Sequence, residues 1–143
     1  MIRHATLSDV DFILDTGFDM LQEGHYSLYE YDFDKTRALI TGLINSDVGM
    51  VIVSEGRGWM MCACVEQWFS SDKIAFDYGL YIKPEFRGGT DAYRMISEYK
   101  KWAEGKGASE IRIGASTGVN TEAVSKLYER SNFKRLGVIY TRS

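Results

Sequence analysis

The sequence predicts an α/β (α+β) fold built on a mixed central sheet of about six to seven strands, and two observations lead to it. Segments that alternate apolar and polar residues are interspersed with segments whose apolar residues recur three and four positions apart, the periods of strands and of amphipathic helices. The chain has 143 residues, 45% hydrophobic and 13% aromatic, with one proline. We therefore expect residues 1–143 to form a single domain around one core.

The first part of the chain is predicted to form one strand and two helices. Residues 2–5 read as a short strand, and Ser8 is a suitable N-cap for the helix that follows. A second helix is predicted from about Asp34 to Asn45. The apolar positions at helical spacing are Val10, Ile13, Leu14 and Leu21 in the first helix and Leu39, Ile40, Leu43 and Ile44 in the second.

Three strands and a helix are predicted next. Residues 50–54 and 59–67 form a hairpin around the turn "EGRG", and residues 73–83 form a third strand after "SSDK". The helix that follows ends near Gly105 and Gly107. Its predicted apolar face contains Ala92, Met95, Ile96, Tyr99, Trp102 and Ala103.

The last part of the chain is predicted to close the sheet. Residues 110–115 alternate as a strand, residues 121–130 read as a short helix, and residues 133–141 read as a closing strand. The predicted order of elements is therefore βααβββαβαβ.

Charge and composition narrow the class of partner. The net charge of −3 argues against general affinity for nucleic acid and favours basic or amine-bearing partners. We expect no membrane partner and a cytoplasmic location, because the N-terminus lacks a signal-peptide core and no apolar run reaches the length of a membrane span. Cys62 and Cys64 lie two apart, on one face of a strand, and neither His4 nor His25 completes a metal motif, so we expect neither a disulfide between them nor a bound metal.

A Gly-Gly turn between the third predicted strand and the third helix has the features of an anion site. Helix N-termini expose unpaired N–H groups, Arg87 adds positive charge, and Gly88 and Gly89 allow close approach to the backbone. Phosphate oxygens, such as those of a pyrophosphate, would suit it. The alternative is a tight turn capped by Thr90. Neither a Walker A motif nor a GxGxxG fingerprint is present.

Two segments resemble the GNAT acetyltransferase superfamily. "YIKPEFRGGTDAYRMI" resembles its acetyl-CoA-binding segment, roughly V-x-P-x-x-[RQ]-x-x-G-x-[GA], and "GVNTEAVSKLYERSNF" resembles its N-x-x-A-x-x-L-Y-E-K-x-G-F segment. Thr90 and Asn132 replace family glycines, and the second segment is one residue longer. The amino-acid sequences of both segments are most similar to those of small acetyltransferase-like proteins encoded by bacteriophages. The matching residues are Ile82, Pro84, Arg87 and Ala92, and then Asn120, Ala123, Leu127, Tyr128, Glu129 and Phe133.

The resemblance implies acetyl-CoA as co-substrate, bound in a cleft between two splayed strands. Gly79 permits a bulge or a close backbone approach beside that cleft. Tyr81 contributes its backbone, and its side chain either contacts the cofactor or is an ordinary strand aromatic. The predicted cofactor-binding residues are Leu80, Tyr81, Ile82, Arg87, Gly88, Gly89, Thr90, Asp91, Ala92 and Asn120.

The implied reaction is direct N-acetyl transfer from acetyl-CoA to a primary amine. Tyr128 matches the family tyrosine that protonates the CoA sulfur; the alternative is that it packs on the core face of its helix. Asp77 or Glu66 is the candidate general base, and ordered water is the alternative. A second reading of the chain is a catalytically weak or inactive GNAT-fold protein that binds CoA or a host protein.

The acidic and aromatic segment "QEGHYSLYEYDFD" is the candidate acceptor-binding region. Glu23 could attract a cationic amine, and His25, Tyr26 and Tyr29 could form the walls of its binding site. The alternative is that this segment is a solvated acidic loop whose aromatic residues fill the core. The acceptor is a small molecule or a lysine or N-terminus of a protein, and the sequence does not choose between them. Trp68 and Phe69 at a hairpin tip fit either core packing or the contact of a homodimer.

Overall fold

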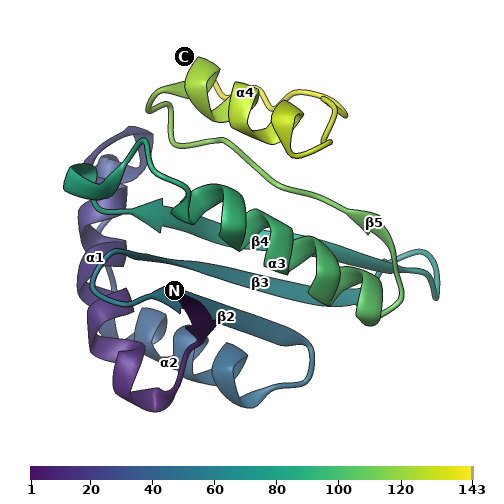
Figure 1. Cartoon of the computed structure of the whole chain (residues 1–143), viewed down its shortest axis with the longest axis horizontal. Helices are drawn as coiled ribbons and strands as arrows, with labels where there is room; N and C mark the ends of the chain where they lie inside the picture. The colour runs from purple at the N-terminus through teal and green to yellow at the C-terminus, as the bar shows by residue number, and fades with distance from the viewer. Residues whose placement is uncertain (143) are drawn as a thin grey trace.

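The computed structural model describes residues 1–142 and contains one five-stranded mixed sheet (Figure 1). The first four strands are antiparallel to their neighbours, and the fifth is parallel to the fourth. The strands, in spatial as well as chain order, are β1 (Ile2–His4), β2 (Gly49–Ser54), β3 (Gly58–Glu66), β4 (Lys73–Ile82) and β5 (Ala108–Ile111).

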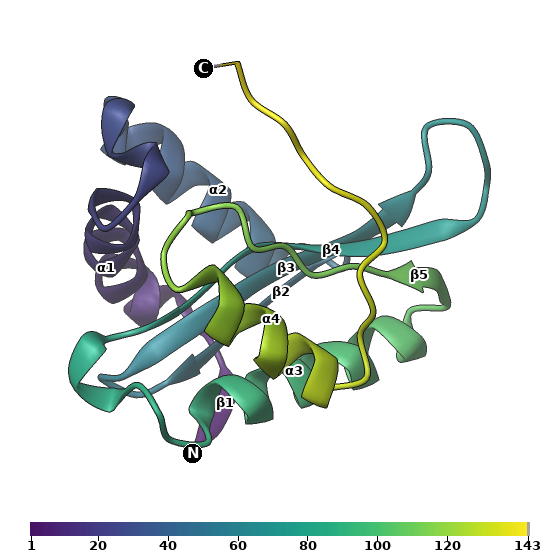
Figure 2. The same cartoon turned by 90° about the horizontal axis from the view of Figure 1, so that it is seen from above.

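Helices cover both faces of this sheet (Figure 2). On one face lie α1 (Val10–Gln22) and α2 (Phe33–Asn45), and on the other lie α3 (Asp91–Gly105) and α4 (Thr121–Arg130). Three 3-10 turns, η1 (Leu7–Asp9), η2 (His25–Leu28) and η3 (Pro84–Phe86), connect these elements. No helix within residues 1–142 is both long enough and apolar enough to cross a membrane.

The alternation of strand residues divides the core into two layers. Val51 and Val53 of β2 pack with α1 and α2, whereas Met50 and Ile52 pack with α3. Cys62 and Cys64 lie on the α3 face, buried and free, as their spacing predicts. Because both faces of β2 and β3 are covered, these strands are apolar at nearly every position.

A buried hydrogen bond fixes α1 on the sheet. The indole Nε1 of Trp59, in β3, donates to Thr16 Oγ1 at 2.8 Å, and Trp59 itself is fully buried. A buried indole N–H without an acceptor would be costly, so this bond selects one position of α1 against β3. The C-terminal end of α1 is thereby held beside β4.

A β-bulge interrupts β4 where the sequence places Gly79. Met61 of β3 lies opposite Gly79, and the next residue, Cys62, lies opposite Asp77, which leaves Tyr78 as the extra residue. A Cβ at position 79 would lie 3.3 Å from the Trp59 ring, so glycine also relieves a tight contact. Bulges re-aim the neighbouring side chains, and this one turns Asp77 and Tyr78 toward the same cleft.

The structure tests the predicted starts of the first two helices. The second helix begins at Phe33, one residue before the predicted start, and Asp32 caps it by accepting from the Lys35 N–H at 2.9 Å. Ser8 as the N-cap of the first helix is wrong, because Ser8 lies inside η1. Asp9 accepts from the Thr6 N–H at 2.8 Å instead, and the Arg3 guanidinium lowers the pKa of Asp9.

The prediction of six to seven strands is wrong, because the closing strand is not formed. Residues 133–142 carry no strand in the described structure, and the predicted strand 110–115 is found as Ala108–Ile111. The last backbone-to-backbone bond from this region to β4 runs from the Arg112 N–H to the Ala75 carbonyl at 2.9 Å. Beyond it the chain diverges from β4 and finds no neighbouring strand to pair with.

Candidate active site

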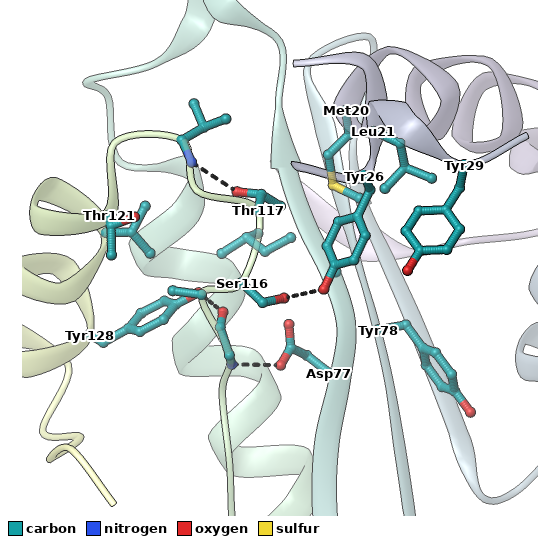
Figure 3. Close-up of a pocket in the computed structure, with 16 residues that line it drawn as sticks. Met20, Leu21, Tyr26, Tyr29, Asp77, Tyr78, Ser116, Thr117, Thr121 and Tyr128 are labelled. Atoms are coloured by element: carbon teal, nitrogen blue, oxygen red, sulfur yellow. Dashed lines mark hydrogen bonds between the residues drawn. The ribbon is translucent and has the colours of Figure 1, made fainter. Parts of the chain in front are cut away.

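A cavity of about 500 Å³ lies between β4 and the segment 112–118 that diverges from it (Figure 3). The bulged part of β4 forms one wall, the diverging segment and α4 form the other, and the end of α1 with η2 covers the side between them. The lining residues are Met20, Leu21, Tyr26, Tyr29, Asp77, Tyr78, Gly79, Leu80, Gly114, Ala115, Ser116, Thr117, Val119, Thr121, Val124 and Tyr128.

Asp77 is a half-buried carboxylate in this cavity. Its Oδ1 accepts a hydrogen bond from the Gly114 N–H at 2.9 Å, across the gap between the two walls. Burial raises the pKa of Asp77 to about 6, although the Gly114 bond opposes that shift. A carboxylate with this pKa is mostly ionised at neutral pH and can still accept and release a proton there.

Tyr128 reaches the same residue, Gly114, from α4. Its hydroxyl donates to the Gly114 carbonyl at 2.6 Å. Burial, together with the charge of Asp77, raises the pKa of Tyr128, so the phenol stays protonated at neutral pH. Gly114 therefore brings an ionisable carboxylate, at its N–H, and a protonated phenol, at its carbonyl, to one residue of the second wall.

The mouth of α3 offers a row of free N–H groups. Within residues 1–142, none of the backbone N–H groups from Gly88 to Tyr93 has a protein acceptor, and the first bond of the helix is Arg94 N–H to Thr90 O at 3.0 Å. The turn takes its left-handed residue at Gly88, with φ of 89°, whereas Thr90 has φ of −100° and needs no glycine. A row of this kind fits the oxygens of a pyrophosphate.

Arg87 is paired with Glu23, although the sequence assigns these two residues to different ligands. The Arg87 Nη2 donates to Glu23 at 2.9 Å, and its Nε donates to the Ile82 carbonyl at 2.8 Å. The guanidinium also lies over the Tyr81 ring, 5.4 Å from its centroid. This pairing raises the pKa of Arg87 and ties the end of α1 to the turn before α3.

Other predicted cofactor-binding residues take different positions. Asp91 accepts from the Ser54 hydroxyl at 3.1 Å and lies 3.7 Å from Arg57, so its side chain anchors the start of α3 to the sheet. Leu80 lines the cavity, whereas Tyr81 and Ile82 are buried in the core layers. Asn120 is exposed and precedes α4 with a left-handed φ of 49°.

The predicted acceptor region bridges the cleft through η2. The His25 N–H donates to the Thr117 carbonyl at 2.8 Å, and the Tyr26 hydroxyl shares a hydrogen bond with Ser116 Oγ, also at 2.8 Å. The rings of Tyr26 and Tyr29 line the cavity, whereas the His25 side chain does not. The bridge depends on Gly24, since a Cβ there would collide with Thr117.

Glu66, the other candidate for the general base, lies outside the cavity. Glu66 is exposed and pairs in register with Lys73 at the hairpin end of the sheet, so the structure does not bring it to the cavity. Sequence reasoning missed Tyr78 and the segment from Gly114 to Thr117. Only the glycine at position 114 gave a signal there, because it interrupts a predicted strand.

Solved structures of acetyltransferases share this architecture. AAC(6')-Iy, in complex with the bisubstrate analogue CoA-S-monomethyl-acetylneamine, has a TM-score of 0.76 and 18% identity, over 100% of this chain and 97% of that one. A putative acetyltransferase from Agrobacterium tumefaciens has a TM-score of 0.74 and 15% identity, over 100% and 99%. The chain has an acetyltransferase fold. An integron cassette protein from the Cole Harbour Salt Marsh metagenome matches with a TM-score of 0.77 and 16% identity, over 99% and 88%.

No family model and no curated protein sequence matches the chain. At these identities the structural similarity supports the GNAT-type fold that the two sequence segments predict. Bacteriophage origin, cytoplasmic location and the roles of individual residues remain predictions.

Proposed function

We propose that the protein is an N-acetyltransferase that moves an acetyl group from acetyl-CoA directly to a primary amine. The observation that carries this proposal is the meeting of Asp77 and Tyr128 at Gly114, in a cavity lined by the part of β4 that leads toward the turn before α3. The acetyltransferase fold and the bound CoA analogue in AAC(6')-Iy support it.

Acetyl-CoA supplies an activated thioester, whose C–S bond breaks as the amine nitrogen bonds to the carbonyl carbon. We assign Asp77 to take the proton that the attacking amine must lose, because its pKa of about 6 leaves it ionised at neutral pH. We assign Tyr128 to give its hydroxyl proton to the departing sulfur. The N–H groups from Gly88 to Tyr93 would hold the pyrophosphate, and Leu80, which lines the cavity, would contact the thioester arm.

We infer that the acceptor is a compact cationic amine. Among residues 1–142, the cavity lining contains Asp77 and four tyrosines, and no lysine, arginine or histidine. Tyrosine faces and a carboxylate both attract a cation. The bridge from η2 to residues 116–117 covers one side of the cavity, which favours a small molecule over a folded protein surface. Aminoglycosides, represented by sisomicin in one similar structure, belong in the test panel.

The test is release of CoA thiol across a panel of small amines and lysine peptides. We expect turnover with at least one cationic small amine, and its loss in the Tyr128→Phe and Asp77→Asn variants. Tight binding of acetyl-CoA with no thiol release on any acceptor would instead support the reading of a protein that binds CoA without turnover.

A further inference from the structure

Residues 23–26, which join α1 to η2 and begin η2, form a strap across one side of the cavity. The His25 N–H donates to the Thr117 carbonyl at 2.8 Å. The Tyr26 hydroxyl shares a hydrogen bond with Ser116 Oγ, also at 2.8 Å (Figure 3). These two bonds attach the strap to the second wall of the cavity, the segment that follows β5.

Close packing at Gly24 makes this attachment stiff. A Cβ at position 24 would collide with the Thr117 carbonyl oxygen and would lie 2.8 Å from Cγ2 of Val119, so no side chain fits there. Closely packed groups transmit a displacement to their neighbours because there is no space to absorb it. We therefore expect the strap and the second wall to shift together, as one unit.

An ion pair ties this unit to the first wall of the cavity, which is β4. Arg87 Nη2 donates to the Glu23 carboxylate at 2.9 Å, and Arg87 Nε donates at 2.8 Å to the carbonyl of Ile82, the last residue of β4. Both charged side chains are partly shielded from water, with 36% of Arg87 and 28% of Glu23 exposed. Arg87 therefore joins the strap to the end of the wall that the sheet fixes.

The same arginine lies at the proposed site of the acetyl-CoA pyrophosphate. Arg87 directly precedes Gly88, where the row of N–H groups without a protein acceptor among residues 1–142 begins. A phosphate group on that row would compete with Glu23 for the guanidinium, because both anions accept hydrogen bonds from its N–H groups. The phosphate and the carboxylate would also repel each other. Binding of the pyrophosphate therefore favours separation of Glu23 from Arg87.

A second contact closes the cavity between the same two walls. Asp77 Oδ1, on β4, accepts from the N–H of Gly114, on the second wall, at 2.9 Å (Figure 3). Asp77 is the base that we assign to the attacking amine, and this bond occupies one oxygen of its carboxylate. A shift of the second wall away from β4 would lengthen the bond and expose that oxygen.

We propose that Glu23 and Arg87 form a latch that keeps Asp77 covered until the phosphates of acetyl-CoA bind. The pyrophosphate takes Arg87 from Glu23, the strap and the second wall shift away from β4, and Gly114 releases the Asp77 carboxylate to the amine. This inference rests on the proposed function, because it requires acetyl-CoA at the start of α3 and Asp77 as the base.

The test compares two fragments of CoA by their effect on hydrogen exchange at the Gly114 amide, measured by NMR. Adenosine 3′-phosphate 5′-diphosphate carries the pyrophosphate without the thiol-bearing arm, and pantetheine carries the arm without the phosphates. We expect the phosphate fragment to accelerate exchange roughly two- to tenfold, the change for one lost hydrogen bond, and pantetheine to leave it unchanged. Acceleration by pantetheine alone would show that the arm opens the wall directly, and the latch would be wrong.

Binding of each ligand is measured separately by calorimetry. If the phosphate fragment binds without changing exchange at Gly114, or fails to bind where intact CoA binds, the latch is overturned and the proposed function is unaffected. If intact CoA does not bind at all, both proposals are wrong. A latch that responds in a protein with no thiol release on any acceptor would leave the coupling in place and remove the transfer reaction.

Glu23→Ala removes the carboxylate of the latch. We expect exchange at Gly114 to be already accelerated in this variant, with no further effect of the phosphate fragment. Asp19→Ala is the matched control, because Asp19 lies one turn earlier on the same face of α1, is exposed, and forms no ion pair among residues 1–142. The control should respond as the wild type does. A Glu23→Ala protein that also responds as the wild type does would show that Glu23 is not the latch.

Discussion

The two walls of the cavity are held in different ways. β4 is paired with β3 in register from Lys73 to Ile82, apart from the one bulge, so its position is set by the sheet. The segment 112–118 has a single backbone-to-backbone bond to the sheet, at Arg112, and otherwise depends on contacts that involve side chains or other elements. These contacts are Tyr99 with Arg112, Asp77 and Tyr128 with Gly114, Tyr26 with Ser116, and His25 with Thr117.

This difference gives the two walls of the cavity different roles. A wall fixed by a ladder of backbone bonds can present Asp77 and Leu80 at constant positions. A wall held by a few hydrogen bonds, each worth about 0.5–1.5 kcal/mol net, can adjust when a ligand enters. Single substitutions should therefore move the second wall and leave the first unchanged, which makes the comparison testable.

The largest effect is expected from Tyr128→Phe. Loss of the general acid should lower kcat by about 10²–10⁴-fold, while affinity for acetyl-CoA changes far less. Single-turnover measurement with an established amine checks this, because slow product release would hide the chemical step.

The same substitution also removes a bond to the second wall, so it needs a matched control. Tyr99→Phe deletes a hydroxyl that donates to the Arg112 carbonyl of the same wall, at 2.5 Å, outside the cavity lining. If both variants lose the same amount of activity, Tyr128 positions the wall and is not the acid.

Asp77→Asn should have the next largest effect, because the amide keeps an acceptor for the Gly114 N–H and loses only the basic charge. We expect kcat/KM to fall by about 10²-fold. In the wild type, kcat/KM should decrease as the pH falls through about 6, because the carboxylate is the active form. A wild-type profile that is flat between pH 5 and 7, values chosen to bracket that pKa, would remove Asp77 as the base.

The free energy of unfolding should depend on pH in the opposite direction to kcat/KM. A carboxyl whose pKa is raised on folding binds its proton more tightly in the native state, so its contribution to stability decreases as the pH rises through about 6. Asp77→Asn removes that decrease and should be at least as stable as the wild type at pH 7, by denaturant titration.

The comparison also explains what sequence alone could predict. The spacing of apolar residues predicted β2, β3, β4 and α2 within a few residues, because each of these elements packs apolar residues against neighbours in the same chain. The closing strand 133–141 has an equally clear alternation, yet a strand forms only where an edge is in reach. Its pattern could not show whether such an edge is in reach.

The site was predictable in its residue types and not in its contacts. Tyr128 and Asp77 were named from a resemblance and from strand position. Their meeting at Gly114 depends on a backbone N–H and a backbone carbonyl, which have no signature in the sequence. For the same reason the pairing of Glu23 with Arg87 was missed, since a charge pattern does not show which opposite charge is nearest in space.

The next prediction concerns Arg87, which lies just beyond the end of β4, and its contribution to acetyl-CoA binding. Arg87→Ala should weaken acetyl-CoA binding by about 1.5–3 kcal/mol, roughly 10- to 150-fold, if the guanidinium turns to the pyrophosphate. Glu23→Gln should leave binding unchanged or tighten it, because it frees that guanidinium. Calorimetry measures both. Equal affinity in wild type and Arg87→Ala would show that the N–H groups at the start of α3 hold the phosphates alone.

The smallest effect is expected from Tyr26→Phe, which releases η2 from the second wall. The change removes the bond to Ser116 and keeps the aromatic ring, so about 0.5–1.5 kcal/mol of positioning energy is lost. We expect a roughly two- to tenfold rise in KM for the amine, with kcat preserved at saturation. Tyr29→Phe is the matched control, because Tyr29 lines the same cavity and its hydroxyl has no hydrogen-bond partner within residues 1–142. If Tyr29→Phe raises KM and Tyr26→Phe does not, then the cavity recognises the amine through Tyr29, and the bridge to Ser116 does not position the acceptor.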